Sequence, residues 1–414
     1  MVVFVSNYIN HHQLPFCKAM LQETGGDFVF VETEKLSEER AKMGWGVTEP
    51  LSFVKQYQTE KAECDRLLME AEHVIFGGAE DEEMIQPRLL AGKPTIRYSE
   101  RLYKEGQWKF ISPKGLKQKY HDHGRFRKNP AYLLCAGAFV AGDYSLVRAY
   151  PGKKFKWGYF PEVIHYDDLW AEKQKNREAV LQEYGIALSK EQPLLLWTGR
   201  QIDWKHPEQV LYLASMLRDD EVPFHLIMVG DGEEHEKLLH FAEKEKLEKQ
   251  VTFLPFMKPE EVRRLMLAAD FYFMTSDARE GWGAVVNEAM NSGCVTVGGS
   301  TVGAVPYLIH DQITGIVYDG KKPDTMSLVL VTSKVWSDVA ARREMGEKAY
   351  RTMRKYWNPE YAASVLVKWM NSGYEEIPEK GPLSRAPRLW PGEGLDYTRR
   401  HMPKEERRLR KKAF

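Results

Sequence analysis

Short apolar runs alternate with amphipathic or loop segments along most of the chain, and this alternation constrains the fold more than any other feature. Over residues 1–165 the runs are "VVFVS", "DFVFVE", "HVIFGG", "PTIRYSE", "YLLCAG" and "FKWGYF". The second half repeats the pattern with "PLLLWTG", "FHLIMVGDG", "VTFLPF", "DFYFMTS", "CVTVGG" and "GIVYDG". Such alternation favours parallel sheets covered by helices, and near-continuous apolar strands are typical of sheets buried on both faces. The sequence therefore predicts an α/β protein.

The chain length and a lapse in the pattern predict two domains. A chain of 414 residues suits two domains of roughly 150 to 200 residues each. The pattern lapses around 163–169, before the charged helix "AEKQKNREAVLQEYG". Apolar residues at helical spacing predict helices in the second half at 207–217, 233–247, 259–269 and 282–292. In such sheets, ligands bind beyond the carboxyl ends of the strands, so informative residues should follow strands.

Composition excludes several classes of protein. Lys plus Arg equals Asp plus Glu at 59 each, which gives no reason to expect a nucleic acid as partner. The four cysteines are far apart and form no zinc or disulfide pattern. The sequence opens with the apolar run "MVVFVS", which lacks the basic, apolar and small-residue pattern of a signal peptide, and no apolar run approaches the roughly 18 residues of a membrane span. We expect a cytoplasmic protein.

The last residues, "RRHMPKEERRLRKKAF", are strongly basic. They could contact an anionic surface, which here would be the inner face of a membrane, or form a solvated terminal segment. The sequence leaves both interpretations open.

Cations and glycines follow the first strand of the second half. In "WTGRQIDWKHPEQ", Arg200 comes one residue after Gly199, and Lys205 lies just before a predicted helix. A strand end, a helix N-terminus and two cations together favour binding of an anion such as a diphosphate. The turn at Gly230 in "VGDGEE" is a weaker candidate for contact with a nucleotide, because such turns also serve packing.

Two acids flank a glycine turn in "SDAREGWGAVVNEAMNSG". Glu280 precedes Gly281, Trp282 and Gly283, and Glu288 lies eight residues further on, among apolar residues of the predicted helix. Eight helical residues span up to about 12 Å, which suits opposite ends of one long polar ligand. Glu288 is expensive to bury without a partner, and a hydroxyl-rich ligand would supply one.

These segments resemble a known family. "GRQIDWK", "VGDGEE", "VTFLPF", "TSDAREGWGAVVNEAMNSGCVTVGG" and "VGAVPYLIHDQITGIVYDG" are similar to the donor-binding lobe of GT-B retaining glycosyltransferases, particularly glycosyltransferase family 4. The resemblance implies two Rossmann-like, doubly wound domains facing a central cleft. It implies an acceptor-side domain at 1–165, a donor-binding domain at 166–356, a helix at 357–376 that crosses back to the first domain, and an irregular basic tail at 377–414.

The resemblance also implies roles for the site residues. Arg200 and Lys205 would hold the diphosphate of a nucleotide-sugar donor, Glu280 would contact hydroxyls of the transferred sugar, and Glu288 would hold the ribose. Glycines and backbone amides would line the donor pocket, with candidates Gly199, Gly230, Gly281, Trp282 and Gly283. Fixed cations can stabilise the departing diphosphate without a metal ion.

The first half offers weaker candidates. His12 follows the first strand and could contact the acceptor, although a packing role is nearly as well supported. Glu100, in "TIRYSERLY", stands where the family often has a histidine that faces the sugar. We read "HDH" at 121–123 and "YDD" at 166–168 as surface polar segments, and we predict no metal site and no cofactor besides the donor.

The sequence thus predicts a retaining hexosyltransferase that acts on a glycan or lipid-linked acceptor in the synthesis of cell-surface polysaccharides or glycoconjugates. A GT-B epimerase or phosphorylase would share the architecture, and a catalytically silent nucleotide-sugar sensor would share the donor site. A nicotinamide-dependent enzyme is disfavoured, because no G-x-G-x-x-G follows the first strand.

Overall fold

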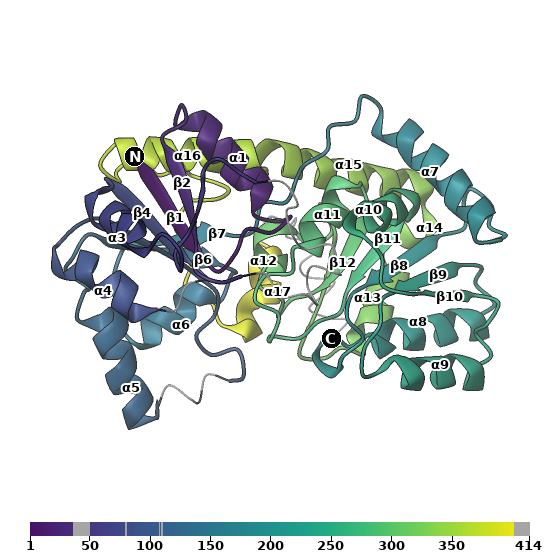
Figure 1. Ribbon diagram of the computed structural model, residues 1–414. Helices are drawn as coiled ribbons and strands as arrows, with labels where there is room; N and C mark the ends of the chain where they lie inside the picture. The colour runs from purple at the N-terminus through teal and green to yellow at the C-terminus, as the bar shows by residue number, and fades with distance from the viewer. Residues whose placement is uncertain (36–49, 79–80, 107, 109–110, 401–414) are drawn as a thin grey trace. The chain divides into compact units, whose positions relative to one another are not determined.

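A computed structural model describes residues 1–35, 50–78, 81–106, 108 and 111–400. The chain forms two compact units (Figure 1). The first unit contains Met1–Glu162 and Lys355–Trp390, and the second contains Val163–Arg354 and the described residues from Pro391 onward.

The first unit is built on a seven-stranded sheet in the order β3-β2-β1-β4-β5-β6-β7, with parallel pairing throughout. Its strands are β1 (Val2–Ser6), β2 (Phe28–Glu32), β3 (Val54–Gln56), β4 (His73–Gly77), β5 (Thr95–Ser99), β6 (Ala131–Ala136) and β7 (Lys154–Trp157). The central strands β1 and β4 are buried along their whole length, as their apolar runs predict.

Helices cover both faces of this sheet (Figure 1). Helices α1 (Leu14–Glu23) and α16 (Pro359–Asn371) pack together on one face. The other face carries α3 (Lys61–Glu70), α4 (Glu82–Leu90) and α6 (Val140–Leu146). A short helix α5 (Pro113–Lys119) continues into the π-helical turn η2 (Tyr120–Gly124).

The second unit has a six-stranded parallel sheet in the order β10-β9-β8-β11-β12-β13. Its strands are β8 (Leu194–Thr198), β9 (His225–Val229), β10 (Val251–Leu254), β11 (Phe271–Met274), β12 (Val295–Gly299) and β13 (Ile316–Tyr318). Its helices are α7 (Leu169–Glu183), α8 (Glu208–Asp219), α9 (His235–Lys244), α10 (Pro259–Ala268), α11 (Val285–Asn291), α12 (Val305–Leu308), α13 (Thr325–Val331), α14 (Lys334–Ser337), α15 (Val339–Tyr356) and α17 (Gly394–Thr398), with 3-10 turns η3 (Asp203–Lys205) and η4 (Pro391–Glu393).

The predicted α/β class with doubly wound, Rossmann-like units is confirmed. Helices α8 and α9 pack side by side on one face of the second sheet, and α10 packs with α7 and α11 on the other (Figure 1). Two predicted helices were too long: α9 covers His235–Lys244 and not 233–247, and α11 begins at Val285 and not at Trp282. Gly283 has a φ of +94°, which a right-handed helix cannot include.

The end of the chain is more ordered than predicted. Within the segment expected to be irregular, α17 packs against α12, and Arg399 Nε lies 3.0 Å from Oδ2 of the buried Asp311. Most of the basic tail, residues 401–414, lies outside the described residues, so its contact with a membrane stays a prediction. Among the described residues, no helix combines the length and apolarity needed to span a bilayer.

Candidate functional site

Two loops of the second unit lie at the point where the order of the strands in the sheet reverses. From β8 the chain winds outward through β9 and β10, then returns to place β11 on the other side of β8. Ligands of open α/β sheets bind at such a switch point, beyond the carboxyl ends of the strands. The loops that follow β8 and β11 are those with the predicted cations and acids.

Lys205 and Glu280 meet at this point. Lys205 Nζ donates a hydrogen bond to Glu280 Oε2 over 2.8 Å, and Ser276 Oγ donates to the same oxygen over 3.1 Å. Both side chains of the ion pair are mostly buried, with 18% and 16% of their surfaces exposed. The structure therefore brings together two of the three residues predicted to be catalytic.

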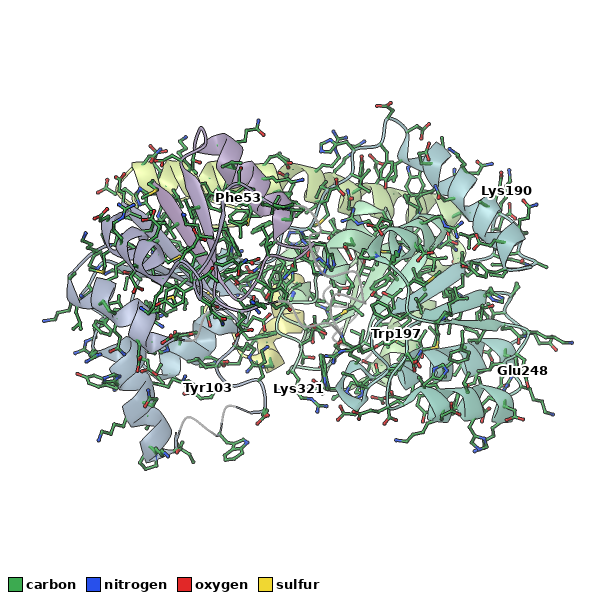
Figure 2. The ribbon with its side chains drawn as sticks, in the orientation of Figure 1. Phe53, Tyr103, Lys190, Trp197, Glu248 and Lys321 are labelled. Atoms are coloured by element: carbon green, nitrogen blue, oxygen red, sulfur yellow. The ribbon has the colours of Figure 1, made fainter. Side chains whose placement is uncertain are left out.

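Backbone and side-chain hydrogen bonds join the two loops. Trp197 of β8, labelled in Figure 2, donates through Nε1 to Thr275 Oγ1 over 2.8 Å. Thr275 Oγ1 in turn donates to the carbonyl of Lys205 over 2.6 Å. The position of the lysine backbone is thus fixed by the first residue after β11.

A charged network lies beside this pair. His206 contacts Glu208 through Nδ1 at 3.2 Å and Asp277 through Nε2 at 3.4 Å. Arg279 bridges Asp277 and Asp203, with nitrogen–oxygen distances of 2.8 and 3.1 Å. Hydrogen bonds with Asp277 and Glu208 raise the pKa of His206 to about 9. Burial opposes ionisation of Asp277, yet hydrogen bonds with His206 and Arg279 outweigh it and lower the pKa to about 2.

Arg200, the third predicted catalytic residue, follows β8 and is exposed. Its side chain makes no hydrogen bond or ion pair with any residue that the structure describes, so its charge is available to an anion. The loop after β9 passes close to Gly199, the residue before Arg200. A Cβ atom added to Gly230 would lie 1.9 Å from the carbonyl oxygen of Gly199. These two glycines therefore let the loops after β8 and β9 touch.

The remaining donor-side candidates are buried. Glu288 is 7% exposed in α11, and Arg263 Nη2 lies 3.6 Å from its Oε1. Helix α10 thus supplies a partner for Glu288 that the sequence reasoning did not consider, and contact of Glu288 with a ligand stays a prediction. Trp282 is 1% exposed, and its Nε1 donates to Asn287 Oδ1 over 3.0 Å, so its indole serves packing. Gly281 and Gly283 are buried in the same turn.

The first unit contains a polar cavity of about 660 Å³ at its own switch point, between β1 and β4. Residues that follow β1, β4 and β5 line it, among them Asn7, Asn10, Gly78 and Glu100. Glu100 is positioned by two neighbours: Tyr159 donates to its Oε1 over 3.0 Å, and Lys104 forms an ion pair with its Oε2. Glu100 therefore faces a cavity able to bind hydroxyl groups.

His12 lies elsewhere. Its ring centroid is 3.8 Å from that of His11, and its backbone N–H donates to Asn10 Oδ1 over 3.0 Å. Asn10 and Gln13, which flank His12 in the sequence, line the cavity. His12 is not among the described residues that line it. Its proposed contact with the acceptor stays a prediction.

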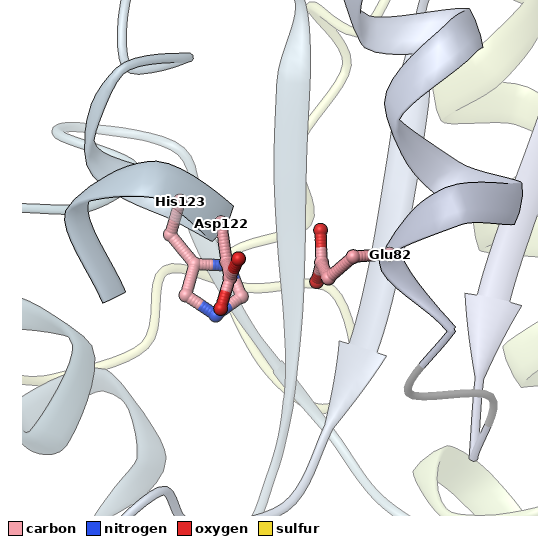
Figure 3. A group of neighbouring side chains, drawn as sticks. All are labelled: Glu82, Asp122 and His123. Atoms are coloured by element: carbon pink, nitrogen blue, oxygen red, sulfur yellow. The ribbon is translucent and has the colours of Figure 1, made fainter. Parts of the chain in front are cut away.

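The prediction that "HDH" is a surface segment is wrong for two of its residues. Asp122 and His123 are each 5% exposed, because η2 packs against α4 and Tyr150. They form with Glu82 a group whose ligand-type atoms lie within 4.8 Å of one another, with Glu82 on α4 opposite the residues of η2 (Figure 3). Sequence reasoning missed this group, because Glu82 is distant in the chain.

A guanidinium group already neutralises one of these acids. Arg97 donates to Glu82 Oε1 and Oε2 over 2.6 and 2.9 Å, and to the carbonyl of Asp122 over 3.0 Å. Burial and the charge of Arg97 lower the pKa of His123 well below its usual value, so its imidazole is neutral. A cation bound here would face the guanidinium, which disfavours it. The group is better suited to hydrogen bonds with a neutral polar ligand in the cavity.

Comparisons with known proteins show which family part of the chain resembles. Residues 183–352 match the family model described as glycosyl transferases group 1. D-inositol 3-phosphate glycosyltransferase of Corynebacterium glutamicum is 27% identical over 181 residues, which cover 42% of this chain and 42% of that protein. The matched part is thus less than half of the curated relative.

Solved structures resemble nearly the whole chain. HepE of Anabaena in complex with UDP has a TM-score of 0.65 at 14% identity, over 90% of this chain and 99% of HepE. WaaG, a glycosyltransferase involved in lipopolysaccharide biosynthesis, has a TM-score of 0.57 at 19% identity, over 88% of this chain and 99% of WaaG. The predicted resemblance to GT-B glycosyltransferases is confirmed, whereas membership of family 4 in particular stays a prediction.

Proposed function

We propose that this chain, whose residues 183–352 match the group 1 glycosyltransferases, is a retaining glycosyltransferase that moves a sugar from a nucleotide diphosphate donor to a glycan or lipid-linked acceptor. The observation that carries the proposal is the Lys205–Glu280 pair at the switch point of the second unit, in loops that also include the exposed Arg200 after β8. We place the reaction in cell-surface polysaccharide or glycoconjugate synthesis, on the cytoplasmic side of the membrane.

The donor would bind to the second unit through opposite charges. When the anomeric C–O bond breaks, negative charge grows on the diphosphate, and fixed cations stabilise it. Arg200 and Lys205 supply that charge, so the proposed reaction needs no metal ion. Glu280 would then exchange its hydrogen bond with Lys205 for hydrogen bonds with sugar hydroxyls, while Glu288 would hold the ribose.

The acceptor would bind to the polar cavity of the first unit. Amide, hydroxyl and carboxylate groups line this cavity, and such groups bind the hydroxyls of a sugar or polyol. Glu100 is held by Tyr159 and Lys104 with its carboxylate at the cavity. We propose that Glu100 positions an acceptor hydroxyl and that the departing phosphate takes its proton.

Release of nucleoside diphosphate tests the proposal. Purified protein is incubated with a panel of donors, beginning with UDP-sugars because HepE was solved with UDP, and with glycan and lipid-linked acceptors. Acceptor-dependent release, with the product retaining the anomeric configuration, is expected. Release that requires inorganic phosphate would instead identify a phosphorylase, and an isomerised donor without acceptor would identify an epimerase. Tight binding of UDP with no turnover on any pair would indicate a sensor.

A further inference from the structure

A small cavity of about 80 Å³ lies at the amino ends of three neighbouring strands in the second unit. Its lining includes Lys190, four residues before β8, Asp270, directly before β11, and Gly293, two residues before β12. Lys205 and Glu280, by contrast, follow the carboxyl ends of β8 and β11. The cavity is therefore separate from the proposed donor site, at the opposite edge of the sheet.

Basic residues dominate the lining of this cavity. The whole chain has 59 basic and 59 acidic residues, yet five of the six charged residues that line the cavity are basic. Asp270 is the one acid among the described residues of the lining. We call this site the basic cavity, and its cations are Lys173, Arg177, Lys190, Arg342 and Arg343.

Two arginines share the carboxylate of Asp270. Arg177 Nη1 lies 2.6 Å from Oδ2 of Asp270, and Arg342 Nη1 lies 3.3 Å from Oδ1. Arg342 is 4% exposed, and its buried Nη1 donates no hydrogen bond within the described part of the chain. Lys173, which is 8% exposed, donates through Nζ to two backbone carbonyls over 2.8 and 3.0 Å. One carboxylate thus serves three buried or mostly buried cations.

This imbalance of charge is costly to the folded protein. A buried charge raises the free energy unless an opposite charge and hydrogen bonds offset it. Burial lowers the pKa of Lys173, which is a direct sign of that cost. The carbonyls that Lys173 contacts accept hydrogen bonds but carry no full negative charge. An anion in the cavity would supply the missing charge.

We propose that the basic cavity binds a phosphate-type oxyanion. The cavity has room for a few water molecules, and therefore for one tetrahedral group whose oxygens face the guanidinium groups. Lys190 and Arg343 are exposed, so an ion can enter between them from the solvent. The proposal concerns binding and stands whether or not the chain transfers a sugar.

Calorimetry of the full-length protein with inorganic phosphate tests the proposal. Saturable binding with a Kd of about 1 mM or below is expected, which is within the limit for so small a ligand. Lys190→Gln combined with Arg343→Gln should weaken binding about tenfold, because each exposed charge pair contributes up to about fivefold. Both side chains are exposed, so this double variant should fold, as circular dichroism would verify.

A second variant tests the sign of the charge effect. Asp270→Asn keeps the shape of the side chain and removes the acid that competes with phosphate for Arg177 and Arg342. Phosphate should therefore bind about fivefold more tightly, or better, than to the unmodified protein. Weaker binding to this variant, once circular dichroism shows that it is folded, would contradict the proposal.

Two controls make the test specific to the basic cavity. Arg351 is another exposed arginine of α15, paired with Glu347, and Arg351→Gln should leave phosphate binding unchanged. The proposed donor site also attracts anions, so the titrations are repeated with saturating UDP and with Arg200→Gln. Phosphate should still bind in both experiments.

Glycerol phosphate distinguishes the sources of the phosphate group. Tighter binding of inorganic phosphate assigns the cavity to the free ion, and tighter binding of glycerol phosphate assigns it to the phosphate group of a larger molecule. Absence of saturable binding for both compounds would overturn the proposal. Loss of binding with UDP or in Arg200→Gln would assign phosphate to the donor site and overturn it too, as would an equal loss in Arg351→Gln and the double variant.

Discussion

Lys205 Nζ lies 2.8 Å from Glu280 Oε2, so the cation assigned to the diphosphate is held by the acid assigned to the sugar. An opposite charge at this distance offsets part of the attraction between the lysine and an anion. The proposed binding of a donor diphosphate to Lys205 would therefore compete with an interaction within the protein. This competition distinguishes the roles of the two residues.

Replacing Glu280 with glutamine should separate affinity from turnover. Without the carboxylate, Lys205 is free to face the diphosphate, so the affinity for UDP should stay the same or rise. Transfer should fall by about 100-fold or more, because contacts with the reacting sugar are lost. Calorimetry with UDP and a transfer assay measure the two effects. A large loss of UDP affinity would show that Glu280 contacts the nucleotide, contrary to its assigned role.

Arg200 should contribute to affinity and not to stability. Its side chain is exposed and makes no hydrogen bond or ion pair with any described residue, so Arg200→Gln should leave the melting temperature unchanged. UDP affinity should fall about tenfold, and the loss should shrink at high salt, because an exposed charge is screened. Lys190→Gln is the matched control: this exposed cation precedes β8, at the opposite end of the strand (Figure 2). Equal effects of the two substitutions would exclude a specific contact for Arg200.

Much of the fold was readable from the sequence because its signals are local. Apolar runs mark the strands, and α11 ends at Asn291, close to the predicted end at 292, before Gly293 with its φ of +68°. The Lys205–Glu280 pair joins segments 75 residues apart, and family resemblance alone pointed to it. Contacts without such a pattern were missed. Arg263 beside Glu288, and Arg97 between Glu82 and Asp122, depend on how α10 and η2 pack, which no local spacing encodes.

The network around His206 should make the second unit sensitive to pH. Because the pKa of His206 is raised from 6.5 to about 9, its charge stabilises the fold fully below about pH 6.5, and this stabilisation is lost as the pH rises through 9. Asp277 has the opposite pH dependence, because its pKa is lowered from 3.8 to about 2. Its charge stabilises the fold fully above about pH 3.8, and this stabilisation is lost as the pH falls through 2.

Thermal unfolding of His206→Gln measures the first effect. At pH 6 the variant should melt about 2–4 °C below the unmodified protein, for a loss of about 1 kcal/mol from a partly exposed ion pair. The difference should disappear by about pH 10, beyond the raised pKa. His240→Gln, at an exposed position of α9, is the control and should show no such dependence. A difference that stays constant with pH would show that His206 acts through packing and not through its charge.

Gly230 should be intolerant of any side chain, because the loops after β8 and β9 meet there. Its φ is +131°, and a Cβ would lie 1.9 Å from the carbonyl oxygen of Gly199. Gly230→Ala should therefore cost about 3 kcal/mol or more, through strain and displacement of the backbone. Gly185→Ala is the control that measures backbone strain without a steric clash. Gly185 has a φ of +63°, and no atom lies within 4 Å of the position of its Cβ, so the expected cost is about 1–2 kcal/mol. Since Gly199 precedes Arg200, only the substitution at Gly230 should also weaken UDP binding. Equal losses of unfolding free energy at both positions would mean that the loop after β8 moves aside without a measurable cost. Gly230 would then have no special part in positioning Arg200.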